Sequence, residues 1–416
     1  MKIRIRRKIT INLYTMISVL SFIVLAYYFL PITASVLTAY MMLGILGLSY
    51  FIIFIYNDWT RKEIVFSNFL LICSAVILFL IREYYKDGLI GVYSILLVFF
   101  PAFLSICMLS KGHKKTLEKF AICALIMLGI TAITTYIGLN VYPELARDLA
   151  AYSTDNIIGL STKYNIGGYD IVYCVVLVIP MVCLLVEKKM PKLLKIIFKI
   201  LTFLCSLVFI VKTQYTTGML LAIVSCGMII AIRKFDLKRL CILALLGLLV
   251  LNSFKSEISN VLSNASSTIE SQSISQRLDE VSRALEGGKV TGEDMTARGN
   301  AYGKSLDAFE EHPVLGTWFA SDNEALGGHS TILDLMAGAG IFAFLLVAYT
   351  FYYIIKLVGK KIQGDITKKY VGIFLLIYIV LAIVNPIISG AFFSVMFIIL
   401  PGVALIEDKS LEDISR

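Results

Sequence analysis

The sequence has little charge for its length, and its long apolar stretches carry almost none. Charged residues make up 16 % of the 416 residues, against 58 % hydrophobic residues. So few charged side chains cannot cover the surface of a soluble domain of this size. The composition therefore excludes that class and indicates a polytopic membrane protein. The charges near apolar runs lie at their ends, as at Arg82, Asp170, Lys212 and Asp334.

Histidine is scarce, and cysteine is missing from the hydrophilic loops, where it could form disulfides or bind a metal. All eight cysteines fall within apolar segments that we expect to be helices, and the hydrophilic loops contain none. This pattern argues against a disulfide framework and against a thiolate metal site. The three histidines, at 113, 312 and 329, are too few and too scattered to indicate a zinc site. We therefore predict no metal and no cofactor.

Apolar runs long enough to cross a membrane recur along the chain and predict an all-α bundle of about twelve transmembrane helices. The first run has no clear small-residue cleavage site, so we interpret it as a helix rather than a signal peptide. The run at 240–253 is short for a span. The predicted helices are 12–30, 33–56, 64–81, 89–109, 120–139, 169–186, 196–211, 215–232, 240–253, 331–356, 370–387 and 389–406.

The distribution of lysine and arginine predicts the orientation of the bundle. Most of the 38 cations lie in the short segments of one side, together with both termini. By the positive-inside rule, both termini are then cytoplasmic. Cations at the inner leaflet face anionic lipid, so the net charge of +9 requires no nucleic-acid partner.

This orientation divides the chain into three parts. Residues 1–252 hold helices one to nine and an external loop at 140–168; residues 253–330 form a large external loop; residues 331–416 hold the last three helices and a cytoplasmic tail. Within the large loop, apolar spacing predicts a helix at 265–286, stopped by two glycines. We predict a second helix at 298–311.

His329 and Arg298 are the main candidates for chemistry. His329 precedes an apolar helix, where a neutral imidazole is favoured and suits a general base. The alternative is a histidine that only packs or caps. Arg298 opens the second loop helix, and a guanidinium can grip phosphate oxygens. Its alternative is a salt bridge with Glu293, Asp294 or Glu310.

Further residues are candidates for contact with the same anion or with the rest of a substrate. Lys212 lies in a polar segment between two predicted helices, and Arg147 and Lys163 lie in the first external loop. Asp334 stands at a helix mouth, and Tyr302 lies on the second loop helix. For each of the three cations taken alone, the sequence favours an ordinary exposed surface charge.

The ordered motifs around these candidates resemble the superfamily of O-antigen ligases and Wzy-type polysaccharide polymerases. The resemblance covers about 50 residues, 298–347: Arg298, a short helix, His312-Pro313-Val314-Leu315-Gly316, Gly328-His329-Ser330 and Gly338-Ala339-Gly340. A weaker likeness lies in Gly159 to Asn165, Gly167-Gly168-Tyr169 and Pro180. Many members have a Ser-Arg-Gly-like stretch where this chain has Thr216-Thr217-Gly218, so Lys212 would have to replace that arginine.

The resemblance implies a GT-C-like architecture and a metal-independent glycosyltransferase on the outer face of the bacterial cytoplasmic membrane. Its donor and acceptor would be oligosaccharide repeat units on undecaprenyl diphosphate, polymerised into a capsule or O-antigen. In this interpretation His329 takes the proton of the acceptor hydroxyl, and Arg298 neutralises the leaving diphosphate. A flippase and chain-length regulator proteins would be its partners.

Two alternatives stay open. A ligase of the same superfamily would transfer finished polymer to another acceptor; His329-Ser330 rather than His-Asn favours a polymerase. A lipid-linked oligosaccharide flippase also has about twelve spans, but a transporter normally needs titratable or cationic groups between its helices, and the predicted spans hold almost none.

Overall fold

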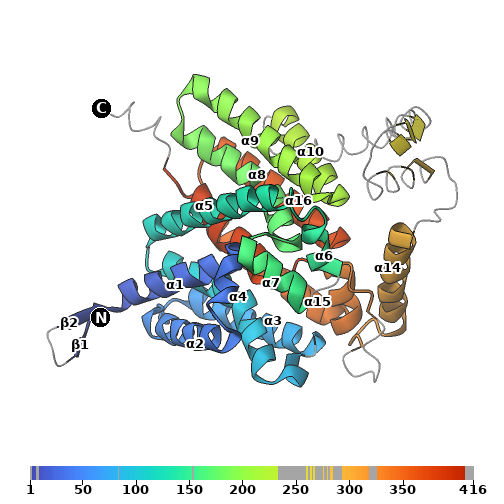
Figure 1. The fold of residues 1–416 in the computed structure, drawn as a ribbon. Coiled ribbons are helices and arrows are strands. Elements are labelled where there is room, and N and C mark those ends of the chain that lie inside the picture. The colour runs from blue at the N-terminus through green and yellow to red at the C-terminus, as the bar shows by residue number, and fades with distance from the viewer. Residues whose placement is uncertain are drawn as a thin grey trace.

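The computed structural model describes residues 2–5, 9–82, 84–151, 154–232, 293–317 and 326–407, with isolated positions between 259 and 283. This part of the chain is a bundle of helices (Figure 1). Its elements are β1 (Lys2–Ile5), β2 (Ile9–Asn12), α1 (Leu13–Phe29), η1 (Pro31–Ser35), α2 (Ala39–Tyr56), α3 (Lys62–Ile81), η2 (Tyr84–Asp87), α4 (Leu89–Ser110), α5 (Lys114–Gly138), α6 (Leu145–Ala151), α7 (Asp155–Tyr164), α8 (Tyr169–Lys189), α9 (Lys192–Thr213), α10 (Thr216–Ala231), α14 (Glu293–Glu311), α15 (Thr331–Gly359), α16 (Asp365–Val384), α17 (Gly390–Ser394), the π-helical turn η4 (Val395–Ile399) and α18 (Leu400–Ala404).

The helices have the length and composition of membrane spans. In the described part of the chain, eight helices are long and apolar enough to cross a membrane: α2, α3, α4, α5, α8, α9, α15 and α16. Shorter apolar helices occupy Leu13–Phe29, Thr216–Ala231 and Gly390–Ala404. The chain is therefore a helical, multi-pass membrane protein. The predicted span 240–253 lies outside the described residues, as do most positions of the predicted helix 265–286.

Three segments differ from the sequence-based expectation. Lys2–Ile5 and Ile9–Asn12 pair as antiparallel strands ahead of α1, where no strand was expected. The loop 140–168 contains two short helices, α6 and α7, where we expected only a loop with turns. Helix α14 begins at Glu293, five residues before the predicted start, and ends at Glu311, as expected from the proline at 313.

Contacts near the helix termini show which termini lie at the same end of the bundle. At one end, Lys360 Nζ lies 2.9 Å from Glu63 Oε1, and Lys188 Nζ donates to the carbonyl of Ala404 at 2.7 Å. At the other end, Thr331 N–H donates to the carbonyl of Asn385 at 3.3 Å. We call the first the cationic end, because lysines of α5, α8, α9, α15 and α16 gather there. Figure 1 shows α14 lying across the other end, far from the N-terminal hairpin.

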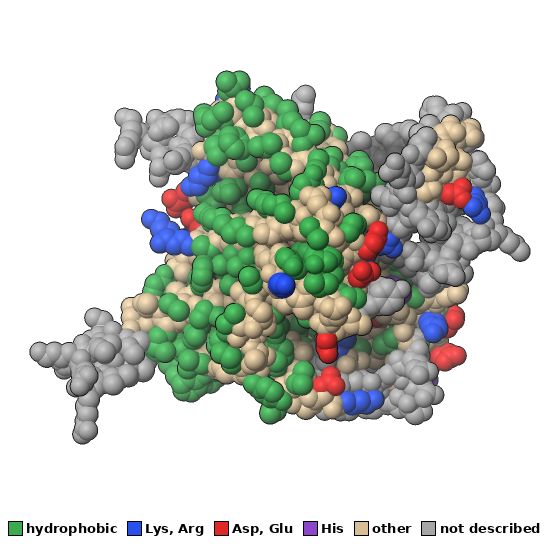
Figure 2. Space-filling model, viewed as in Figure 1, with side chains coloured by type: hydrophobic (Ala, Val, Ile, Leu, Met, Phe, Trp, Pro, Cys, Tyr) green, Lys and Arg blue, Asp and Glu red, His purple; other side chains and the backbone are tan. Residues whose placement is uncertain are grey.

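The core is centred on α8, which contacts α5, α9, α10, α16 and the C-terminal helices. Its side chains from Ile171 to Met181 are all buried. Some buried polar side chains form hydrogen bonds between helices: Ser74 of α3 donates to Thr350 of α15 at 2.9 Å. Hydrogen bonds of this kind join neighbouring helices in membrane proteins. The face in Figure 2 is mainly hydrophobic; a group of charged side chains lies at its left margin, and others are scattered over its right half.

Candidate active site

The candidate site lies at the N-terminus of α15, at the end opposite the cationic end. Ser330 is the N-cap of this helix, and its Oγ accepts a hydrogen bond from the N–H of Leu333 at 3.1 Å. A serine cap satisfies one of the free N–H groups of the first turn. The preceding residue, His329, is exposed. The fold therefore presents this imidazole outside the bundle on a capped helix end.

Asp334 holds the turn that carries His329. Its Oδ1 accepts hydrogen bonds from Ser305 Oγ at 2.7 Å and from Gly328 N–H at 3.3 Å. Its Oδ2 accepts from Ser330 N–H at 3.3 Å. Ser305 is almost fully buried, and its Oγ also accepts from Gly327 N–H at 3.0 Å. The carboxylate that we proposed as a substrate contact is thus engaged in fixing the backbone on both sides of His329.

Helix α14 packs directly against this turn. Ala301 and Ala308 are buried. A Cβ on Gly327 would lie only 1.9 Å from the carbonyl oxygen of Ala301, so only glycine permits this approach. The hydroxyl of Tyr302 donates to the carbonyl of Val384 at 2.8 Å. Tyr302, another expected substrate contact, therefore fastens α14 to the end of α16.

The structure brings together the two backbone segments that carry the main candidates. Arg298 lies on α14, three residues before Ala301, and Gly327 lies two residues before His329. Gly327 packs against the backbone of Ala301, so α14 and the turn are in contact at this point. Arg298 and His329 each lie within three residues of this contact along the chain. The described part of Arg298 is its helical backbone.

Helix α15 is interrupted at Gly340, after its first turns. Gly340 has φ +73°, and a Cβ there would lie 2.2 Å from the carbonyl oxygen of Val314. The segment after α14 runs along the break: Ile341 N–H donates to the carbonyl of Pro313 at 2.9 Å, and Thr317 N–H donates to that of Ala337 at 3.0 Å. This exchange satisfies backbone groups that the break frees, as broken membrane helices require.

The other three cations lie in a second group of contacts at the same end. Arg147 of α6 is 4.0 Å from Glu144, and Lys163 of α7 lies 5.2 Å from the ring centroid of Tyr164. Lys212 is half-buried in the last turn of α9. The hydroxyl of Tyr215, in the α9–α10 turn, donates to the carbonyl of Ala146 at 2.8 Å and ties this turn to α6.

A ring cluster and the 385–389 segment lie between the two groups. The ring of Tyr169 contacts those of Tyr215 and Phe392, each with centroids 6.2 Å apart. Asn385 is the first residue of this segment, and its carbonyl accepts a hydrogen bond from the Thr331 hydroxyl at 3.2 Å. Its Nδ2 is buried and has no hydrogen-bond partner among the described residues. Sequence reasoning missed Asn385, because the prediction ran a helix through it to 387.

An apolar groove of about 390 Å³ begins beside the candidate site. Thr331, Ile332 and Ile387 line the end of the groove next to the turn that carries His329. The groove continues between α15 and α16 as far as Ile355 and Leu375. Its lining is almost entirely hydrocarbon and aromatic. The arrangement can therefore hold an apolar chain inside the bundle while a polar group stays near the imidazole.

The electrostatics of the second group involve one tyrosine pair. The pKa of the Tyr164 hydroxyl is lowered, mainly by its hydrogen bond with Tyr142 and secondarily by the Lys163 cation.

Within the described residues, no three His, Cys, Asp or Glu side chains gather in a way that could hold a metal ion. The sequence matches no protein-family model, and no curated protein matches it.

Proposed function

We propose that the chain is a membrane glycosyltransferase that polymerises oligosaccharide repeat units carried on undecaprenyl diphosphate. The observation that supports this most is the position of His329. His329 is exposed, Asp334 holds the backbone on both sides of it, and Thr331, two residues on, lines an apolar groove that enters the bundle. A lipid-linked sugar needs both features, a dry path for its tail and an aqueous place for its reacting group.

The proposed reaction transfers a glycan from the lipid diphosphate to a sugar hydroxyl. The Nε2 or Nδ1 atom of His329 accepts the proton of the acceptor hydroxyl, whose oxygen attacks the anomeric carbon of the donor. The bond between that carbon and the diphosphate oxygen breaks, and undecaprenyl diphosphate leaves with the bonding electrons. Arg298 would neutralise the leaving group, assisted by Lys212, Arg147 or Lys163. Balance requires no metal or redox cofactor.

The fixed turn supports a catalytic role for His329. Asp334 and Ser305 together form four hydrogen bonds in and around this turn, so the backbone that carries His329 is restricted. Restricting a general base in this way lowers the entropic cost of reaching the transition state. Asp334 and Tyr302 act in this proposal as positioning residues rather than as groups that touch the diphosphate.

The proposal includes a location and a sidedness. The cationic end would face the cytoplasm of a bacterial cell, and the His329 turn, α14 and the loop 140–168 would face outward from the inner membrane. Donor and acceptor would reach the site from the outer leaflet after a separate flippase has delivered them. Chain-length regulators would act on the same outer surface.

A complementation experiment tests the proposal in cells. A strain that lacks this chain is complemented with the wild type, with His329→Ala, or with His312→Ala as the matched control. His312 is also exposed and lies at the end of α14. We expect single repeat units with His329→Ala and normal polymer with His312→Ala. Long lipid-linked polymer in the deletion strain would instead favour a ligase, and normal polymer with His329→Ala would contradict the proposal.

A further inference from the structure

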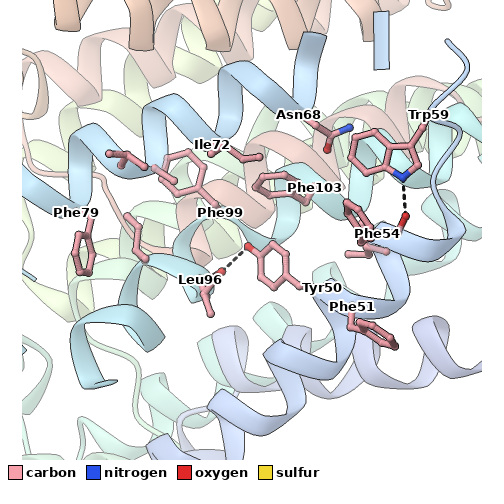
Figure 3. A pocket seen from close by; sticks show the side chains of 14 residues that line it. Tyr50, Phe51, Phe54, Trp59, Asn68, Ile72, Phe79, Leu96, Phe99 and Phe103 are labelled. Carbon is pink, nitrogen blue, oxygen red and sulfur yellow. Dashed lines mark hydrogen bonds between the residues drawn. The ribbon is translucent and has the colours of Figure 1, made fainter. Parts of the chain in front are cut away.

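A second apolar groove lies toward the cationic end of the bundle. It has a volume of about 530 Å³ and runs between α2, α3 and α4. Aromatic rings make much of its wall, among them Tyr50, Phe54, Phe99 and Phe103 (Figure 3). The Tyr50 hydroxyl donates to the carbonyl of Leu96 at 2.8 Å, which occupies its polar atom within the protein. The groove therefore suits a hydrocarbon chain.

Trp59 stands where this groove meets the cationic end. Its indole N–H donates to the carbonyl of Phe54 at 2.7 Å, and the two rings are 5.1 Å apart. Figure 3 shows this bond and the indole at one end of the groove. Trp59 also lines a separate hollow of about 610 Å³, together with Thr60 and Lys62. The two hollows thus share one tryptophan, a residue type typical of the membrane interface.

The shared mouth carries positive charge that is not neutralised locally. Lys62 is exposed, lines the outer hollow and forms no ion pair with a described residue. The neighbouring Arg61 uses Nη1 to donate to the carbonyl of Ser110 at 3.0 Å, which positions its guanidinium without removing its charge. An exposed lysine beside a tryptophan, at a mouth that these two residues line together, suits a phosphate group, and the charge of Arg61 next to it in the chain adds to the positive potential.

The carboxylates nearby are already engaged. Glu63 lies 2.9 Å from Lys360, and Asp58 accepts from the hydroxyl of Thr60 at 2.7 Å. The pKa of the Asp58 carboxyl is lowered, first by this hydrogen bond and further by the surrounding lysine and arginine charges. Glu63 and Asp58 therefore leave Lys62 available to an external anion.

We propose that these two hollows form a binding site for one anionic phospholipid of the adjoining leaflet. One acyl chain occupies the groove between α2, α3 and α4, and the phosphate lies at Trp59 and Lys62. A zwitterionic lipid could fill the groove but would gain less at the mouth, because its own cation offsets the phosphate. The site lies at the opposite end from His329 and does not depend on the proposed glycosyl transfer.

Fluorescence of Trp59 tests this site in the full chain. The sequence has two tryptophans, so Trp318→Phe leaves Trp59 as the sole emitter. The protein is reconstituted into phosphatidylcholine vesicles that contain a small fraction of a lipid brominated in its acyl chains. This brominated lipid is either phosphatidylglycerol or phosphatidylcholine. We expect brominated phosphatidylglycerol to reach half-maximal quenching at about fivefold lower mole fraction. Equal quenching by the two lipids would overturn the proposal.

Variants separate the site from a general attraction of anionic lipid to the cationic end. Lys62→Glu should abolish the preference for brominated phosphatidylglycerol. Lys368→Glu removes an exposed lysine at the same end, away from both hollows, and should keep the preference. Ala75→Phe fills the groove and should weaken quenching by brominated phosphatidylglycerol. A preference that survives Lys62→Glu, or is equally lost in Lys368→Glu, would contradict a site at Trp59.

Discussion

The carboxylate of Asp334 accepts a hydrogen bond from the hydroxyl of Ser305 at 2.7 Å and thereby joins the first turn of α15 to the middle of α14. The same carboxylate accepts from the backbone N–H groups of Gly328 and Ser330. One side chain therefore fixes the helix end, the neighbouring helix and the residues on both sides of His329. The position of the proposed base depends on this one carboxylate.

Removing this carboxylate should loosen the turn. We expect Asp334→Ala to destabilise the protein by about 2 kcal/mol and Ser305→Ala by about 1 kcal/mol, since each leaves buried polar groups without partners. Polymerisation should fall more with Asp334→Ala. Thermal unfolding in detergent measures the first effect, and polymer yield the second. The control is Asp307→Ala, which removes an exposed carboxylate of α14. Indistinguishable behaviour of Asp334→Ala and Asp307→Ala would contradict this role.

The break in α15 predicts a sharp difference between two glycines of one helix. Gly340→Ala forces a side chain into positive φ and against the carbonyl of Val314, so we expect a loss of about 3 kcal/mol or more. Gly359→Ala, near the end of the same helix, meets no atom within 4 Å and should be close to neutral. The midpoint of thermal unfolding distinguishes them. Similar midpoints for both variants would show that the break is not required.

Filling the groove beside the candidate site should affect substrates according to their lipid length. Ala348 lines this groove, so Ala348→Phe should reduce transfer from a full-length polyprenyl donor by at least about tenfold and affect a short-chain donor less. Leu345→Phe changes an exposed position of the same helix outside the groove and serves as control. Equal loss with long and short donors would show that the groove does not hold the tail.

Reporter insertions test the sidedness of the bundle. Two kinds of reporter are compared, one that is active only in the cytoplasm and one that is active only outside it. After Gln363, between α15 and α16, we expect activity from the cytoplasmic reporter alone. After His312, beyond α14, we expect activity from the external reporter alone. The opposite pattern, or activity of both insertions in one compartment, would reverse the proposed orientation and remove the site from the outer surface.

Much of the fold could be predicted from apolar runs alone. Each of α1 to α5 and α15 to α16 overlaps a predicted span, because a run of about twenty apolar residues has few alternatives to a membrane helix. Helix boundaries were less accurate. Helix α5 begins at Lys114 rather than at 120, since its lysine-bearing first turn continues the helix beyond the apolar run.

The tertiary details of the site could not be predicted in this way. The backbone at Gly340 depends on its contact with Val314, twenty-six positions earlier, and no local pattern specifies that pairing. The partners of Asp334 lie on another helix and on the turn before its own. The placement of His329 at an exposed helix mouth did follow from the sequence, because a polar stretch there meets an apolar run. Its proposed chemistry stays a prediction.

Transfer by the purified protein tests the proposed chemistry most directly. The wild type, His329→Ala and His312→Ala are each incubated in detergent with a lipid-linked repeat unit, and the products longer than one repeat are measured over time. We expect the rate to fall by about 10²- to 10⁴-fold with His329→Ala and to stay within a factor of about two with His312→Ala. Equal rates for the wild type and His329→Ala would contradict a base at this position.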